Sequence, residues 1–272
     1  MSLTSSSDRR AELAHNLAAV RARVAAACAA AGRDASEITL IAVTKTRPAV
    51  DVVALAGLGL ADFGENRDQE ATPKAAEVAD MTSAAISWHF IGQLQSNKAH
   101  SVVRYADVVH SVDRVRLVRA LGAAVRGAVS PQGAVSPQGA VSPQGAVSPQ
   151  AAASPQAAAP VRPLRCLVQV SLDGDPSRGG VPVPRIPEVA AAIEAEAGLV
   201  LAGLMAVAPL GIAADAAFAA LPAISGTLRE INPAATIISA GMSGDLEAAV
   251  GNGATHLRIG TALLGNRSLP VL

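Results

Sequence analysis

The sequence predicts an α/β fold, a single (β/α)8 barrel that covers residues 1–272. Eight short runs of β-branched and aliphatic residues alternate with segments of helical periodicity. A lysine and two glycine-rich loops follow such runs, at the strand ends where α/β proteins place their ligand sites. A doubly wound open sheet is the competing architecture. The count of eight strands favours the closed barrel.

The predicted elements follow one another along the chain. A helix begins near Asp8, capped by Ser7, and ends at Gly32, because glycine favours helix termination. The predicted strands are 38–43, 60–63, 86–91, 108–111, 164–170, 201–206, 236–239 and 255–259. Helices are expected over 50–58, 69–79, 113–126, 189–197 and 213–231, and a short one after residue 245. Pro222 is expected to break the helix over 213–231.

A low-complexity insertion interrupts this pattern over residues 127–160. It contains four copies of Gly-Ala-Val-Ser-Pro-Gln. A six-residue repeat can indicate a β-solenoid, but proline in every copy and few large apolar residues favour a disordered linker. Long insertions in surface loops cost little stability. We assign this insertion no function.

The composition excludes several classes of protein. A formal net charge of +0 and only 2% aromatic residues argue against a nucleic-acid partner. Cys28 and Cys166 lack metal-site or redox spacing, so we expect reduced, buried thiols. We find neither a membrane-length apolar run nor a signal peptide. These features predict a soluble cytoplasmic protein with no membrane partner, and we assign no metal ligand.

Lys45 lies at the carboxyl end of the first predicted strand. Its ammonium follows an apolar run, and partial desolvation lowers the pKa of such a group and favours the neutral amine that attacks carbonyls. Pro48 then prevents further strand pairing. The alternative is a surface lysine that ends a strand.

Two glycine-containing loops follow the seventh and eighth predicted strands, where barrels bind phosphate. They contain Ser243 between Met242 and Gly244, and Thr261 after Gly260. Glycines allow close backbone approach, and the two hydroxyls can donate hydrogen bonds. The alternative is two ordinary turns, but their joint placement favours phosphate binding.

A lysine opposite a phosphate site suggests two ligand classes. One is pyridoxal 5′-phosphate held as a Schiff base, and the other is a phosphorylated sugar cleaved by a lysine aldolase. Arg258 could point inward toward a pyridine nitrogen, which a guanidinium would keep unprotonated. The alternative for Arg258 is a surface salt bridge.

Five ordered motifs together resemble the pyridoxal phosphate homeostasis proteins. The motifs are Ala-Val-Thr-Lys-Thr-Arg-Pro (42–48), Phe-Gly-Glu-Asn-Arg-Asp-Gln-Glu (63–70), Trp-His-Phe-Ile-Gly-Gln-Leu-Gln-Ser-Asn-Lys (88–98), Gly-Met-Ser-Gly-Asp (241–245) and Arg-Ile-Gly-Thr (258–261). Apart from the insertion, the resemblance extends from the first helix to about Gly265.

That resemblance implies a barrel like the N-terminal domain of alanine racemase, the type III fold of pyridoxal phosphate proteins. It implies that Lys45 is the Schiff-base lysine, that the phosphate is bound by Ser243, Gly260 and Thr261, and that Arg258 lies near the pyridine nitrogen. Asn66 and the loop around Met242 and Gly244 would flank the cofactor. His89 is placed near the pocket, with a hydrogen-bonded core histidine as the alternative. Arg47 and Arg178 stand where many members carry lysine, which leaves any role of those lysines unsupported here.

Three functions remain open from the sequence: a carrier that buffers or delivers pyridoxal phosphate, an amino-acid racemase, and a sugar-phosphate aldolase. A racemase needs acid/base groups on both faces of the substrate, and Tyr105 is the only tyrosine. We expect no room for the extra domain that supplies this tyrosine in alanine racemase. The carrier is therefore favoured and no catalytic residue is assigned. Its partners would include apo forms of pyridoxal phosphate enzymes, and the chain would be a monomer or weak dimer.

Overall fold

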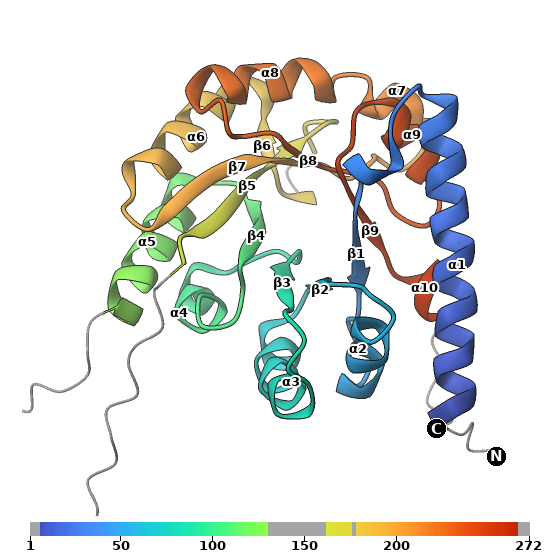
Figure 1. The fold of residues 1–272 in the computed structure, drawn as a ribbon. Coiled ribbons are helices and arrows are strands. Elements are labelled where there is room, and N and C mark those ends of the chain that lie inside the picture. The colour runs from blue at the N-terminus through green and yellow to red at the C-terminus, as the bar shows by residue number, and fades with distance from the viewer. Residues whose placement is uncertain (1–5, 130–161, 176–177, 266–272) are drawn as a thin grey trace, which may run out of the picture.

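Eight parallel strands close into a barrel, and helices surround it (Figure 1). The structure is a computed structural model that describes residues 6–129, 162–175 and 178–265. The strand order is β4-β3-β2-β1-β9-β8-β7-β5, and pairing between β4 and β5 closes the ring. The predicted (β/α)8 barrel is therefore confirmed.

The strands lie close to their predicted positions. They are β1 (Thr39–Val43), β2 (Asp62–Glu65), β3 (Ser87–Phe90), β4 (Val108–Val112), β5 (Leu164–Ser171), β7 (Leu199–Met205), β8 (Ile237–Ser239) and β9 (His256–Ile259). A short additional strand, β6 (Val181–Pro182), pairs with β5. Strand β1 lies between β2 and β9, so the first and last strands of the ring are neighbours.

Ten α-helices are present among the described residues. They are α1 (Ser6–Ala30), α2 (Ala49–Ala56), α3 (Asp68–Met81), α4 (Ala99–Val102), α5 (Val115–Val129), α6 (Ile186–Ala195), α7 (Ala214–Phe218), α8 (Leu221–Ile231), α9 (Leu246–Gly251) and α10 (Thr261–Leu264). The predicted break near Pro222 separates α7 from α8, because proline is tolerated in the first turn of a helix. In the described ranges, no helix has the length and apolar character needed to span a bilayer.

Helix α5 ends three residues later than the helix predicted over 113–126. Helix α5 continues through Gly127 to Val129. A glycine inside a helix costs about 1 kcal/mol, and packing of the amphipathic face of α5 offsets that cost. The rest of the predicted insertion, residues 130–160, lies outside the described residues.

The hydrophobic core has two parts, because successive residues of a strand point to opposite sides. The larger part lies between the strands and the helices and includes Phe63, Trp88 and Leu257. A small cluster consists of Val108, Leu167, Ala202 and Met205. Other inward positions hold polar side chains, which bond one another across the barrel, as described below. Cys28 and Cys166 are buried free thiols, as the sequence predicts.

Candidate functional site

Lys45 lines a pocket of about 330 Å³ at the carboxyl ends of the strands. The pocket is also lined by Gly260 and Thr261, from the loop after β9. The two loops meet because β1 pairs with β9. The structure thus brings together the predicted reactive lysine and part of the predicted phosphate site. Arg47 lines the same pocket and donates to the carbonyl oxygen of Gly265 (2.6 Å).

A strained turn follows Lys45. Thr46 has φ 62°, in the left-handed region that β-branched residues rarely adopt. The turn is held by a bond from the Arg47 amide to the Thr44 carbonyl (3.0 Å). A second bond runs from the Thr46 amide to Glu70 Oε2 (3.2 Å). Strain of this kind persists only where the surroundings enforce it, and it is concentrated at functional sites.

A buried ion pair anchors the strand end just before Lys45. Lys74 on α3 donates to Glu65 Oε1 (2.7 Å) and to the carbonyl oxygen of Thr44 (2.8 Å). The Thr44 hydroxyl donates to the same Glu65 oxygen (2.7 Å). Sequence reasoning missed this group. Its one signal was a glutamate at the end of a strand followed nine positions later by a lysine in the next helix.

The loops after β8 and β9 are joined by Ser243. Its hydroxyl accepts a hydrogen bond from the amide of Ala262 (3.2 Å), so the two predicted phosphate loops are in direct contact. Gly241, at φ 89°, precedes this loop, and a Cβ there would lie 2.6 Å from the Cβ of Ala249. Met242 and Gly244 are exposed at the tip of the first loop.

Arg258 points into the barrel and is only 5% exposed. Its Nη1 donates to the carbonyl and hydroxyl oxygens of Ser239, both at 2.7 Å, and its Nη2 donates to the carbonyl of Ala206 (2.9 Å). Burial lowers the pKa of Arg258 to about 10, although Asp245 acts in the opposite direction. The guanidinium is therefore charged at neutral pH, and the surface salt bridge considered from the sequence is excluded.

Asn66 and His89 have different environments. The Asn66 Oδ1 atom is buried, and no described residue donates a hydrogen bond to it. His89 is 1% exposed inside the barrel and bonds Asp62 (2.9 Å) and His110 (2.8 Å). It is not among the residues that line the Lys45 pocket. Asn66, Ser243 and Arg258 do not line that pocket either. The hydrogen bonds of His89 fit the alternative interpretation of a core histidine, whereas Asn66 retains a free acceptor.

Comparison with known proteins supports the motif-based resemblance. Residues 145–268 match the family model of the alanine racemase N-terminal domain. The pyridoxal phosphate homeostasis protein of Mycobacterium tuberculosis is 42% identical over 96% of this chain and 95% of its own length. The protein of the same name from Escherichia coli is 34% identical over 94% of this chain and 97% of its own length.

Solved structures agree with this assignment. PipY of Synechococcus elongatus, solved with pyridoxal phosphate bound, is 29% identical and matches with a TM-score of 0.69 over 93% of this chain and all of its own. Alanine racemase of Corynebacterium glutamicum matches with a TM-score of 0.60 at 14% identity, over 97% of this chain and 62% of that enzyme, and shows the fold alone. Because its named relatives are 34% and 42% identical over nearly the full length of both chains, this chain belongs to the pyridoxal phosphate homeostasis protein family.

Proposed function

We propose that this chain binds pyridoxal 5′-phosphate at Lys45 and serves its homeostasis, by buffering or delivery, without efficient catalysis. The observation that carries the proposal is the pocket shared by Lys45 and the Gly260–Thr261 loop. The bound cofactor in PipY, a structure of the same barrel, supports it further.

The residues present fit this cofactor. The pocket contains a primary amine, and hydroxyl groups of Ser243 and Thr261 lie in the two joined loops. The buried Oδ1 atom of Asn66 needs a donor, and a ligand that supplied one would offset its desolvation cost. Arg258 has used three guanidinium N–H groups on described residues, and arginine has five.

Each residue can be given a chemical role. Pyridoxal phosphate would supply an aldehyde, and the Lys45 amine would hold the cofactor through a C=N bond, with the aldehyde oxygen leaving as water. Ser243, Thr261 and the backbone N–H groups of their loops would donate to phosphate oxygens. Arg258 would hold the ring nitrogen unprotonated, because a guanidinium only donates hydrogen bonds.

The position of Tyr105 supports a carrier over a racemase. A racemase needs acid/base groups on both faces of the substrate carbon. Tyr105, the only tyrosine of the sequence, packs against the outer part of the core and does not line the Lys45 pocket. Burial of its hydroxyl, with Asp68 and Glu65 nearby, raises its pKa above the usual value.

This function suggests a location and partners. Two buried free thiols suit a reducing compartment, and we place the protein in the cytoplasm. If the protein delivers the cofactor, its partners would be apo forms of pyridoxal phosphate enzymes. We propose that the protein itself is a monomer or weak dimer.

Borohydride reduction followed by peptide mapping tests the proposal. The sequence contains three lysines, at positions 45, 74 and 98, so the label has few possible positions. We expect a visible absorbance band before reduction and label on Lys45 afterwards. Lys98→Ala is the matched control and should keep both signals, whereas Lys45→Ala should lose both. Label on Lys74 or Lys98, with Lys45→Ala still coloured, would contradict the assignment.

A further inference from the structure

A chain of hydrogen bonds crosses the barrel interior and ends at Arg258. Asp62 Oδ1 lies 2.9 Å from His89 Nε2, and His89 Nδ1 lies 2.8 Å from His110 Nε2. His110 Nδ1 lies 3.0 Å from the hydroxyl of Ser239, which accepts from Arg258 Nη1 at 2.7 Å. The five residues come from β2, β3, β4, β8 and β9, and strands β4 and β8 are not neighbours in the ring.

When each imidazole carries one proton, the two ends of this chain determine the direction of every bond. A guanidinium can only donate, and an ionised carboxylate can only accept. The Ser239 hydroxyl therefore accepts from Arg258 and gives its own hydrogen to His110 Nδ1. His110 then donates from Nε2 to His89, and His89 donates from Nε2 to Asp62. In this arrangement the single proton of each imidazole is on Nε2.

Burial and charge agree with this assignment. His110 and Ser239 are 0% exposed. Burial, followed by the nearby His89 and Arg258, lowers the pKa of His110 well below its usual value, so it is neutral. Burial alone would raise the pKa of Asp62, but the hydrogen bond that it accepts from His89 lowers the pKa overall, so the carboxylate is ionised. The Ser87 hydroxyl, 3.3 Å from His89 Nε2, can share that hydrogen without reversing any bond.

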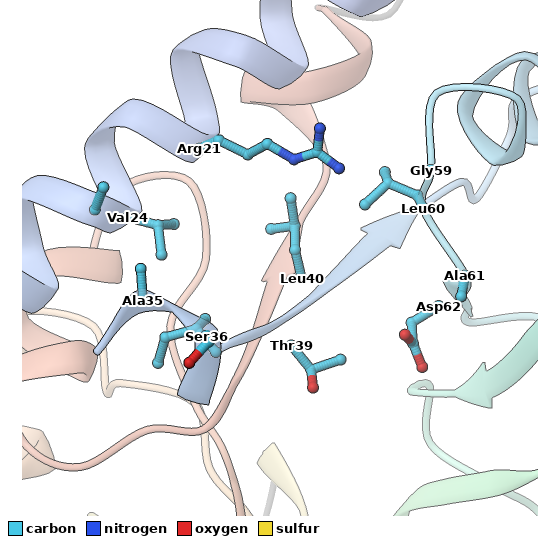
Figure 2. A pocket seen from close by; sticks show the side chains of 12 residues that line it. Arg21, Val24, Ala35, Ser36, Thr39, Leu40, Gly59, Leu60, Ala61 and Asp62 are labelled. Carbon is cyan, nitrogen blue, oxygen red and sulfur yellow. The ribbon is translucent and has the colours of Figure 1, made fainter. Parts of the chain in front are cut away.

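The chain connects the two ends of the barrel. Asp62 begins β2 and lines a second pocket, of about 590 Å³, together with Arg21, Leu40 and Leu60 (Figure 2). Arg258 bonds carbonyl groups at the carboxyl ends of β7 and β8. Asp62 lines a pocket at one end of the barrel. Three intervening side chains therefore connect it by hydrogen bonds to Arg258, the cation expected beside the cofactor at the other end.

We propose that Asp62, His89, His110 and Ser239 are positioning residues that orient the Arg258 guanidinium toward the bound cofactor ring. The identity of the ligand, pyridoxal phosphate, rests on the proposed function. An ionised carboxylate at the end of a hydrogen-bonded chain polarises the bonds that follow, so the Ser239 oxygen becomes a better acceptor for Arg258. A carboxylate that selects a histidine tautomer acts in the same way in catalytic triads.

The tautomers can be measured in the cofactor-free protein. Long-range proton–nitrogen NMR correlations on 15N-histidine protein should show His89 and His110 neutral and protonated on Nε2 at pH 7. The five histidines can be assigned by single His→Gln variants. A proton on Nδ1 of either residue would reverse the chain and overturn the proposal, whether or not the cofactor binds.

The positioning role is tested with cofactor labelled with 15N in the ring. Ser239→Ala and His110→Gln should move the ring-nitrogen signal and raise the Kd about three- to tenfold. Ser239→Thr keeps the hydroxyl and should restore both values. His256→Gln is the matched control: its ring centroid lies 6.5 Å from that of His89, outside the chain, and the variant should keep the wild-type values.

The possible failures are distinguishable. An unchanged ring-nitrogen signal and Kd in a folded Ser239→Ala protein would overturn the positioning role and leave the proposed function intact. A wild-type protein that binds no cofactor would overturn the proposed function and the ligand of this inference together. Thermal unfolding of each variant shows whether it folds, and His110→Gln provides the test if Ser239→Ala does not fold.

Discussion

The ammonium of Lys74 lies 2.7 Å from Oε1 of Glu65, and the two side chains are 9% and 0% exposed. Lys74→Met would leave a buried carboxylate without its cation. We expect the free energy of unfolding to fall by about 3–5 kcal/mol, the usual cost of breaking a buried pair from one side. Urea unfolding followed by circular dichroism measures this loss.

Two further variants check that explanation. The double variant Lys74→Met with Glu65→Leu removes both charges and should recover much of the stability, because apolar replacements of buried pairs are often neutral. The exposed pair of Arg185 and Glu188 is the control, and Glu188→Gln should leave the unfolding midpoint unchanged. A double variant no more stable than Lys74→Met would show that packing, and not charge, explains the loss.

Ser243 should distinguish phosphorylated from unphosphorylated ligand. We expect Ser243→Ala to weaken binding of pyridoxal phosphate by about tenfold, within the range for loss of one hydrogen bond to a charged group. Binding of pyridoxal, which lacks the phosphate, should change less than twofold. Fluorescence titration with both ligands measures the ratio, and Ser36→Ala, on the 590 Å³ pocket, is the control. Equal losses for the two ligands would place Ser243 away from the phosphate.

Acid should destabilise the folded protein below pH 6.5. Burial, followed by the nearby His89, lowers the pKa of His256 from 6.5 to about 4, with Arg165 acting in the same direction and Asp62 against it. Between pH 6.5 and about pH 4, His256 is therefore protonated in the unfolded chain and neutral in the folded protein. The free energy of unfolding therefore decreases as the pH is lowered through that window, by up to about 1.4 kcal/mol per pH unit for each such histidine. His110, whose pKa is also lowered, adds a loss of the same sign.

Unfolding midpoints in urea at pH 7, 6 and 5 measure this dependence. His256→Gln should show a smaller loss between pH 6 and pH 5 than the wild type. His100→Gln, at an exposed position, should follow the wild type. An identical pH dependence in all three proteins would mean that His256 is protonated in the folded state.

Amino-acid turnover should be close to background. We expect cofactor-loaded protein in D2O to exchange the α-proton of L-alanine no faster than free pyridoxal phosphate does, because Tyr105 does not reach the Lys45 pocket. Proton NMR follows the exchange, and chiral chromatography follows racemisation. Exchange at enzymatic rates that Lys45→Ala abolishes would establish an enzyme.

The strands and the site loops could be predicted because their causes are local. Short apolar runs bounded by turn residues identified all eight barrel strands, and Lys45, Ser243 and Thr261 follow three of these runs. Helix ends depend on packing as well as on local preference. The helix predicted over 113–126 therefore ends three residues before α5, whose buried face includes Leu117 and Leu121.

The sequence by itself determined the repeat of strand and helix, the reactive lysine and the loops that accompany it. Only the tertiary structure decided which polar side chains meet inside the barrel. His110 and Ser239 are 129 positions apart and lie on strands that do not pair, so no local periodicity relates them. Closure of the sheet turns their side chains toward one interior, where a buried polar group requires a hydrogen-bond partner. The direction of that network, and the placement of Arg258 at its end, follow from closure.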